Sequence, residues 1–85
     1  ARAVYIISDK AQEIADSILT NLSRGATALK ARGLYRHIDR EVIFTVITLK
    51  DMSKLTELLK DIDPDTFVIV NNVHEVLGDG SRRRT

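Results

Sequence analysis

The sequence predicts an α+β fold with the element order β-α-β-β-α-β. Residues 4–7, 42–47 and 67–70 are short runs of β-branched and aromatic side chains, which is typical of strands. Two stretches between them repeat apolar residues with the helical period. A weaker strand-like stretch with alternating charges lies between the first helix and the second strand-like run. Two right-handed βαβ units joined by a hairpin then give a four-stranded antiparallel ferredoxin-like sheet, with strand order 4-1-3-2 and both helices on one face.

The first half of the chain contains a strand, a helix and a second strand. Residues 3–8 form the first strand, and Asp9 is the expected N-cap of the first helix, with Gln12 completing a variant of the capping box. That helix is expected to end near Ser23, with Gly25 just beyond it. Residues 26–35 predict the second strand, in which Gly33 indicates a bulge or a close approach by other backbone. The apolar stripe of the helix consists of Ala11, Ile14, Ala15, Ile18, Leu19 and Leu22.

The second half repeats the pattern. Residues 36–40 are a polar connection into the third strand, residues 41–49, and Asp51 is the expected cap of the second helix. Residues 63–65 contain Pro64 and end this helix, because proline disfavours helical geometry in the residue before it. Residues 66–72 form the fourth strand, and residues 74–80 a turn-rich segment. The apolar stripe of the second helix consists of Met52, Leu55, Leu58, Leu59 and Ile62.

The strongest strands are apolar at odd and even positions alike. Successive side chains of a strand point to opposite faces, so these strands need cover on both sides of the sheet. Two helices cover one face only, and the fourth strand is an apolar sheet edge. The sequence therefore predicts that the open face associates with another copy of the chain, as a dimer or trimer.

Composition excludes several protein classes. The chain has 85 residues, which make one domain, taken as residues 1–80, followed by a disordered basic tail at 81–85. Without Arg82, Arg83 and Arg84, ten basic residues stand against twelve acidic ones, so the folded part is not basic. The absence of cysteine excludes a disulfide scaffold and a thiolate metal site, and it suits a reducing cytosol. No apolar run approaches the ~20 residues of a membrane helix.

No catalytic or metal-binding motif stands out. His74 and Glu75 are the one pair suited to acid–base chemistry, and they lack a third partner at a recognisable spacing. Asp61, Asp63 and Asp65 alternate like the start of a calcium loop, but Pro64 and the missing glycine and terminal glutamate favour a helix end and a turn. We therefore expect no enzyme, no cofactor and no bound metal.

RNA recognition is the alternative that this element order raises. RNA-binding domains of the same topology carry a basic residue, a glycine and two or three aromatic residues on the third strand. Residues 41–47 offer Phe44 alone. We therefore expect no nucleic acid as a partner.

Several stretches resemble the C-terminal domain of the YitT family of bacterial multi-pass membrane proteins. They are residues 4–9 with Ile14 and Ala15, residues 24–27 with residues 33–35, and residues 62–68 continuing into residues 73–80. Ser81 stands where the family pattern has an aromatic residue. The resemblance implies a ferredoxin-like fold similar to PII-type signalling proteins. It also implies a location on the cytoplasmic side of the membrane, a transmembrane region in the parent protein, and a regulatory or assembly role.

The expected function is that of a non-catalytic regulatory or oligomerisation module. PII-like assembly leaves clefts between subunits, and a small anionic ligand is expected in clefts bordered by the second strand and the C-terminal segment. The candidate ligand residues are Gly25, Thr27, Gly33, Tyr35, His74 and Glu75. The alternative is a purely structural self-association domain that binds no ligand.

Overall fold

The computed structural model describes residues 1–74 together with residues 76 and 77. Glu75, the predicted turn at residues 78–80 and the predicted tail at 81–85 lie outside the described residues. The elements in chain order are β1 (Arg2–Ile7), α1 (Ala11–Ser17) continuing into a π-helical turn (Ile18–Leu22), β2 (Thr27–Gly33), β3 (Ile38–Ile47), a 3-10 turn (Leu49–Asp51), α2 (Met52–Ile62) and β4 (Phe67–Asn72).

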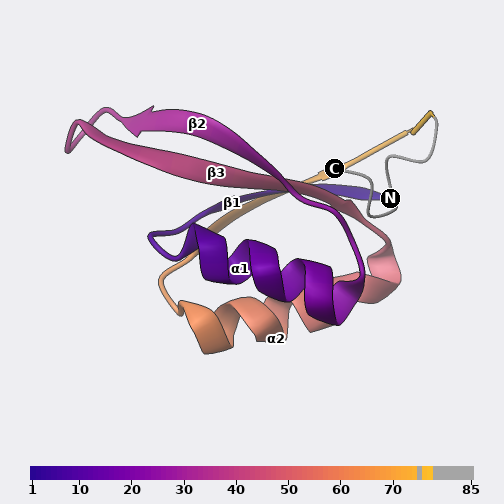
Figure 1. Ribbon diagram of the computed structural model, residues 1–85. Coiled ribbons are helices and arrows are strands. Elements are labelled where there is room, and N and C mark those ends of the chain that lie inside the picture. Colours follow the sequence, from indigo (N-terminus) through magenta and orange to yellow (C-terminus); the bar gives the residue numbers. More distant parts are fainter. Residues whose placement is uncertain (75, 78–85) are drawn as a thin grey trace.

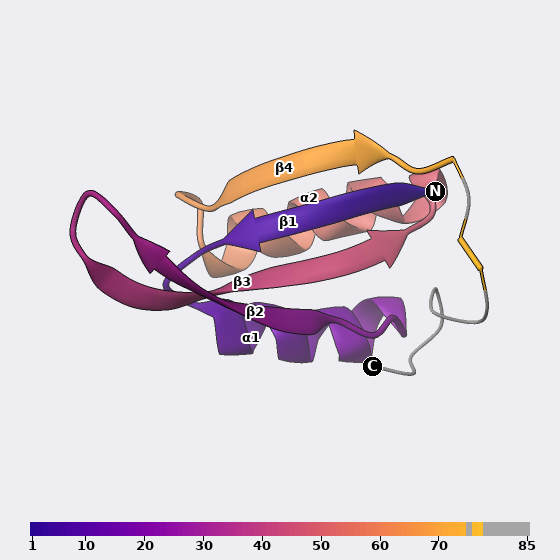
Figure 2. The ribbon, with the colours of Figure 1, turned by 90° about the horizontal axis from the view of Figure 1, so that it is seen from above.

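The four strands form one antiparallel sheet in the order β2-β3-β1-β4, as predicted. Both helices lie on the same side of this sheet, and the other side carries no element in the described part of the chain (Figure 1). Seen from above, α2 lies beneath β1 and β4 and runs along them, whereas α1 lies towards β2 (Figure 2). The predicted α+β ferredoxin-like architecture is therefore confirmed.

The hydrophobic core lies between the sheet and the two helices. Alternate residues of the central strands point into it, and both helices contribute one apolar stripe each. Its buried members are Val4, Ile6, Ile14, Ile18, Leu22, Ile43, Ile47, Leu55 and Leu59. Thr45 is the polar residue buried among them on β3, and its hydroxyl donates a 2.9 Å hydrogen bond to the carbonyl oxygen of Gly25.

The start of α1 differs from the prediction. The N-cap is Lys10 and not Asp9, and the side chain that serves the turn is Ser8, whose hydroxyl accepts the Lys10 amide at 2.9 Å. Asp9 instead accepts a 2.5 Å hydrogen bond from the guanidinium of Arg40 on β3. The capping box is wrong because a charged partner distant in sequence takes the Asp9 carboxylate away from the helix.

The end of the first helix is near the predicted place. The π-helical turn ends at Leu22, and Ser23 adopts the left-handed conformation with φ 53°. A left-handed residue commonly terminates a helix, and glycine is the usual choice because it has no Cβ to clash. Here the left-handed position is held by Ser23, two residues before Gly25.

The second helix also lacks the predicted side-chain cap. Asp51 is the N-cap residue, but its carboxylate makes no capping hydrogen bond. It accepts instead from the hydroxyl of Thr48 at 3.2 Å and from the guanidinium of Arg24 at 3.2 Å. Helix α2 ends at Ile62, before Pro64, as predicted.

The hairpin differs from the prediction in its bounds: β2 ends two residues earlier, at Gly33, and β3 begins three residues earlier and ends two residues earlier, at Ile47. Strand β3 begins at Ile38, and every β2 residue from Thr27 to Gly33 faces one β3 residue without a bulge. The predicted bulge at Gly33 is therefore wrong. Since β1 pairs with β3 only from Val42 onwards, residues 30–41 project beyond the body of the sheet as a two-stranded arm (Figure 2).

Candidate interaction surface

The side of the sheet opposite the helices is lined by three rows of side chains, and we call it the open face. Strand register and alternation place residues of all four strands in two of these rows. The first row is Leu29, Val42, Ile7 and Phe67, the second is Thr27, Phe44, Tyr5 and Ile69, and the third is Val46, Ala3 and Asn71. This surface is apolar apart from Thr27 and Asn71.

The open face is accessible to solvent along both edges. Phe67 is 61% exposed, and Leu29 and Ile69 are 42% and 41% exposed. At the centre, the rings of Tyr5 and Phe44 pack against each other with centroids 5.0 Å apart and an interplanar angle of 47°. Both central rings are half-buried by their neighbours on the sheet alone.

The size of the open face limits what it can do by itself. Four strands about 4.8 Å apart and three rows about 7 Å apart give a flat area of about 400 Å². Apolar patches of this size are at the level where they mark interaction sites on monomeric proteins. A stable interface buries about 800 Å² on each partner, so the open face supplies about half of that area.

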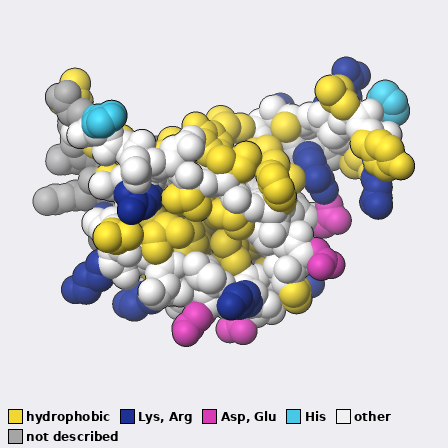
Figure 3. Space-filling model, turned by 180° about the vertical axis from the view of Figure 1, so that it is seen from behind, with side chains coloured by type: hydrophobic (Ala, Val, Ile, Leu, Met, Phe, Trp, Pro, Cys, Tyr) yellow, Lys and Arg dark blue, Asp and Glu magenta, His cyan; other side chains and the backbone are white. Residues whose placement is uncertain are grey.

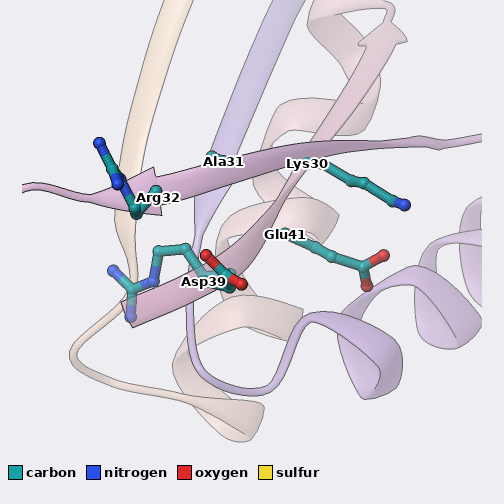
Figure 4. Close-up of a pocket in the computed structure, with 6 residues that line it drawn as sticks. Lys30, Ala31, Arg32, Asp39 and Glu41 are labelled. Carbon is teal, nitrogen blue, oxygen red and sulfur yellow. The ribbon is translucent and has the colours of Figure 1, made fainter. Parts of the chain in front are cut away.

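The arm carries charges of both signs that face each other across the hairpin. Lys30 lies opposite Glu41 and Arg32 opposite Asp39 in the strand register. Figure 4 shows Lys30 and Glu41 projecting to the same side of the arm. Because opposite charges alternate here, the arm has no continuous basic surface of the kind that tracks a nucleic acid backbone.

The tip of the arm is more unusual. Its turn consists of Leu34, Tyr35, Arg36 and His37, of which His37 has a left-handed φ of 56°. Turns usually use glycine, proline, asparagine and aspartate. Tyr35 is 96% and Leu34 73% exposed, so the local fold does not explain these large side chains.

A hollow of about 430 Å³ lies beside this tip. It is lined by Asp9, Gly33, Leu34, Tyr35, Arg36, Ile38 and Arg40. The backbone of Gly33 is not in the left-handed region, and a Cβ added there would meet the Ile38 carbonyl oxygen at 3.7 Å, an ordinary contact. The fold of one copy therefore does not require glycine at this position.

The predicted ligand residues do not form one site within a single copy. Gly33 lies six residues beyond Thr27 along β2, about 20 Å away at 3.3 Å per residue. Gly25 lies just before the start of β2, at the end away from Gly33, and its carbonyl oxygen accepts a hydrogen bond from Thr45 of β3. His74 is exposed just after β4, the other edge of the sheet, and Glu75 is outside the described residues. Because the prediction concerned clefts between subunits, it stays a prediction.

The structure brings Gly33 and Tyr35 together and adds two residues that sequence reasoning missed. Arg36 and Arg40 join them at the hollow because the hairpin has a four-residue turn. Arg40 could have been found from the alternation of side chains along β3, because it lies on the same side of the strand as Val42 and Phe44. Within the described residues, no three His, Asp or Glu side chains gather into a possible metal site.

Comparison with known proteins is informative about the family. A family model described as "Uncharacterized protein conserved in bacteria (DUF2179)" matches residues 24–78. A crystal structure of a DUF2179 protein from Eubacterium ventriosum superposes with a TM-score of 0.73, is 43% identical, and covers 82% of this chain and 96% of that one. A functionally unknown protein from Pediococcus pentosaceus, 17% identical, shares the fold with a TM-score of 0.71 over 88% of this chain and 92% of that one.

Curated relatives include membrane proteins. The chain is 39% identical over 80 residues to the UPF0750 membrane protein YpjC of Bacillus subtilis, covering 94% of this chain and 28% of that protein. It is 37% identical over 83 residues to an uncharacterized protein in the cccA 5' region of a Bacillus species, covering 98% of this chain and 55% of the relative. The chain thus spans about half or less of the length of these relatives.

Among the helices that the structure describes, none is long and apolar enough to cross a membrane. The resemblance to the YitT family is confirmed, since UPF0750 membrane protein YitT of Bacillus subtilis is 29% identical over 73 residues, 86% of this chain and 26% of that protein. The chain belongs to the DUF2179 family and is homologous to part of the UPF0750 membrane proteins.

Proposed function

We propose that this chain is a self-association module of a bacterial membrane protein, in which the open faces of two copies pack together. The observation that carries the proposal is the apolar surface of three rows on the side of the sheet that faces away from both helices. The homology to UPF0750 membrane proteins supports the membrane-protein parent. No catalytic step is part of the proposal.

The expected affinity follows from the area. Two open faces together bury about 800 Å², below the 1,200 Å² at which stable interfaces begin. At about 25 cal/mol per Å², and with about three quarters of the area apolar, the gross driving force is about 15 kcal/mol. Losses of translational and side-chain freedom cancel most of it. The isolated module should therefore dimerise weakly through this face, whereas tethering in a membrane raises its effective concentration.

The test is sedimentation velocity from low to high micromolar concentration. Phe44→Lys places a charge at the centre of the open face and should raise the dissociation constant at least tenfold, without lowering the midpoint of thermal unfolding at low concentration. Leu49→Lys is the matched control, because Leu49 is 66% exposed and lies outside the three rows. A wild-type chain that stays monomeric throughout, or Phe44→Lys association equal to wild type, would contradict the proposal.

The cytoplasmic side of the membrane is part of this proposal. A cysteine-free chain is compatible with the reducing cytosol. Because this chain has no cysteine, Lys54→Cys at an exposed position introduces one labelling site within it, and any cysteines elsewhere in the full-length parent are first replaced by serine. Labelling by an impermeant maleimide in intact cells would contradict the cytoplasmic location, and labelling only after lysis would agree with it.

A second candidate function is regulation by a small anionic ligand between subunits. The hollow at the arm supports it, because Tyr35 offers an aromatic face and Arg36 offers a guanidinium group beside Gly33. Arg40 lines the same hollow and pairs there with Asp9, so an anion would have to compete with that carboxylate. A ligand that binds the native state raises the unfolding midpoint by mass action. Thermal unfolding with nucleotides, amino acids and divalent ions tests this, and Tyr35→Ala should abolish any shift. A flat response across the panel favours the ligand-free structural role.

A further inference from the structure

The two edges of the sheet are protected to very different degrees. The β2 edge carries Lys30 and Arg32, charges of the kind that discourage pairing with another strand. Strand β4, Phe67–Asn72, forms the other edge, and it contains no charged residue, no proline and no glycine. Phe67, Ile69 and Val70 are 61%, 41% and 41% exposed. An edge strand of this composition is a ready template for another strand.

The hydrogen-bond pattern shows which backbone groups of β4 do not bond to β1. The amide of Val73 donates to the carbonyl oxygen of Ala1 at 3.1 Å, and the strand register continues to this pair. In an antiparallel ladder, hydrogen-bonded and non-hydrogen-bonded pairs alternate. Ile69 and Asn71 therefore bond to β1, whereas the N–H and C=O groups of Val68, Val70 and Asn72 point away from it.

A groove of about 350 Å³ runs beside this edge, between β4 and α2. Its apolar lining comes from both layers of the fold: Met52, Leu55 and Leu59 from α2, with Val68 and Val70 from β4. Viewed from behind, a band of hydrophobic side chains follows this side of the molecule (Figure 3). Among the residues that the structure describes, no strand pairs with these outward backbone groups, and an apolar groove lies beside them.

We propose that β4 pairs antiparallel with β4 of a second copy, about a two-fold axis near Ile69 and Val70, to form one continuous eight-stranded sheet. The two-fold axis can pass through Ile69 or through Val70. In both cases the Val70 N–H group donates a hydrogen bond to a backbone carbonyl oxygen of β4 in the second copy. The side chains of Phe67 and Ile69 in the second copy then lie on the same side as those of the first, so the rows of the open face continue across the junction.

A second copy fits this edge better than an isolated peptide strand. The groove is lined by the sheet layer and the helix layer, and an added strand alone would cover the sheet layer only. A two-fold related copy brings its own β4 beside the strand and its own α2 beside the helix. The pairing also supplies contact area that the open face lacks. It relies on the outward backbone groups of β4 and on the groove beside α2, so it does not depend on open-face packing.

The experiment removes the Val70 N–H group, which points away from β1, and keeps the hydrogen bonds between β4 and β1. Val70→Pro deletes a donor that makes no bond to β1, and proline is tolerated on edge strands when its nitrogen faces outwards. Val70→Thr is the matched control, because it keeps the amide and the β-branched shape. In a Phe44→Lys background, where open-face packing is disrupted, sedimentation should show a dimer for Val70→Thr. The Val70→Pro dissociation constant should be at least tenfold higher.

Amide hydrogen exchange gives a second readout that does not depend on the proline variant folding. In Phe44→Lys, exchange at Val68 and Val70 should slow at least tenfold from low to high protein concentration, whereas Ile69, already bonded to β1, should be slow at both. Concentration-independent exchange at Val68 and Val70 would overturn the edge pairing and leave the open-face proposal intact. Loss of association in Val70→Pro but not in Phe44→Lys would overturn the open-face proposal and support the edge.

Discussion

The hydroxyl of Ser8, at the end of β1, donates a 2.5 Å hydrogen bond to the carboxylate of Asp63, at the end of α2. Asp63 also accepts the Asp65 amide at 3.0 Å. One carboxylate thereby fixes the turn that leads from α2 into β4 and ties it to the first strand. Asp61 lies in the last turn of α2, and Asp63 and Asp65 belong to the turn that follows, as the helix-end and turn prediction has it.

This arrangement makes stability depend on pH in the acid range. The Ser8 hydrogen bond, followed by the Asp65 amide, lowers the pKa of Asp63 below its ordinary value of 3.8. The charged form is favoured in the folded state, so its stabilising effect is present above the ordinary pKa and is lost as pH falls through the lowered pKa. Thermal unfolding from pH 6 to pH 2 should show this loss below about pH 4.

The matched variants for this pH effect are Asp63→Asn and Ser8→Ala. Asp63→Asn should lower the unfolding midpoint at pH 6 and reduce the acid-range slope. Ser8→Ala should weaken the slope less, because the Asp65 amide still donates to Asp63. An unchanged slope in Asp63→Asn would mean that other carboxylates control acid unfolding.

Glycine at position 33 should be dispensable for folding. The Cβ of Gly33→Ala would make an ordinary 3.7 Å contact, and the backbone is not left-handed there. Loss of unfolded-state entropy should then stabilise the chain by about 0.4–1 kcal/mol. Urea unfolding of Gly33→Ala at low concentration measures this, and a destabilised variant would reveal a constraint at the arm that its contacts do not show.

Ser23→Gly should stabilise the chain, because Ser23 occupies a left-handed position at the end of the first helix. Relief of the Cβ clash is worth about 1 kcal/mol. Ser53→Gly, inside α2, is the control and should destabilise by about 0.5 kcal/mol, since glycine is a poor helix residue. Equal effects of the two changes would argue against the left-handed assignment.

Leu55 should be the most sensitive position of α2. It is 1% exposed and contacts the core from the helix layer, so Leu55→Ala should cost about 2–5 kcal/mol of unfolding free energy. Leu49→Ala, at an exposed site, should change it by less than about 0.5 kcal/mol. Chemical denaturation of both variants at one protein concentration checks the difference.

The fold and the two-sided apolar character of the central strands could be predicted from the sequence, whereas association of the open face with a second copy stays a prediction. Residues 42–47 are apolar at every position except Thr45, and residues 52–62 carry one apolar stripe, so local periodicity was sufficient to predict a two-layer sheet with an open face. Local periodicity does not say which of two alternating sets is buried. Ile43 and Ile47 proved to be core residues, and Phe44 and Val46 belong to the open face.

Tertiary structure decided the features that depend on partners distant in sequence. Asp9 and Asp51 look like helix caps in the sequence, but Arg40 and Arg24 take their carboxylates. The hollow that joins Gly33 to Arg40 exists because of the hairpin register, and the outward amide of Val70 exists because of the β1–β4 register. Registers and ion pairs of this kind are set by packing between elements, which leaves no periodic signal in the chain.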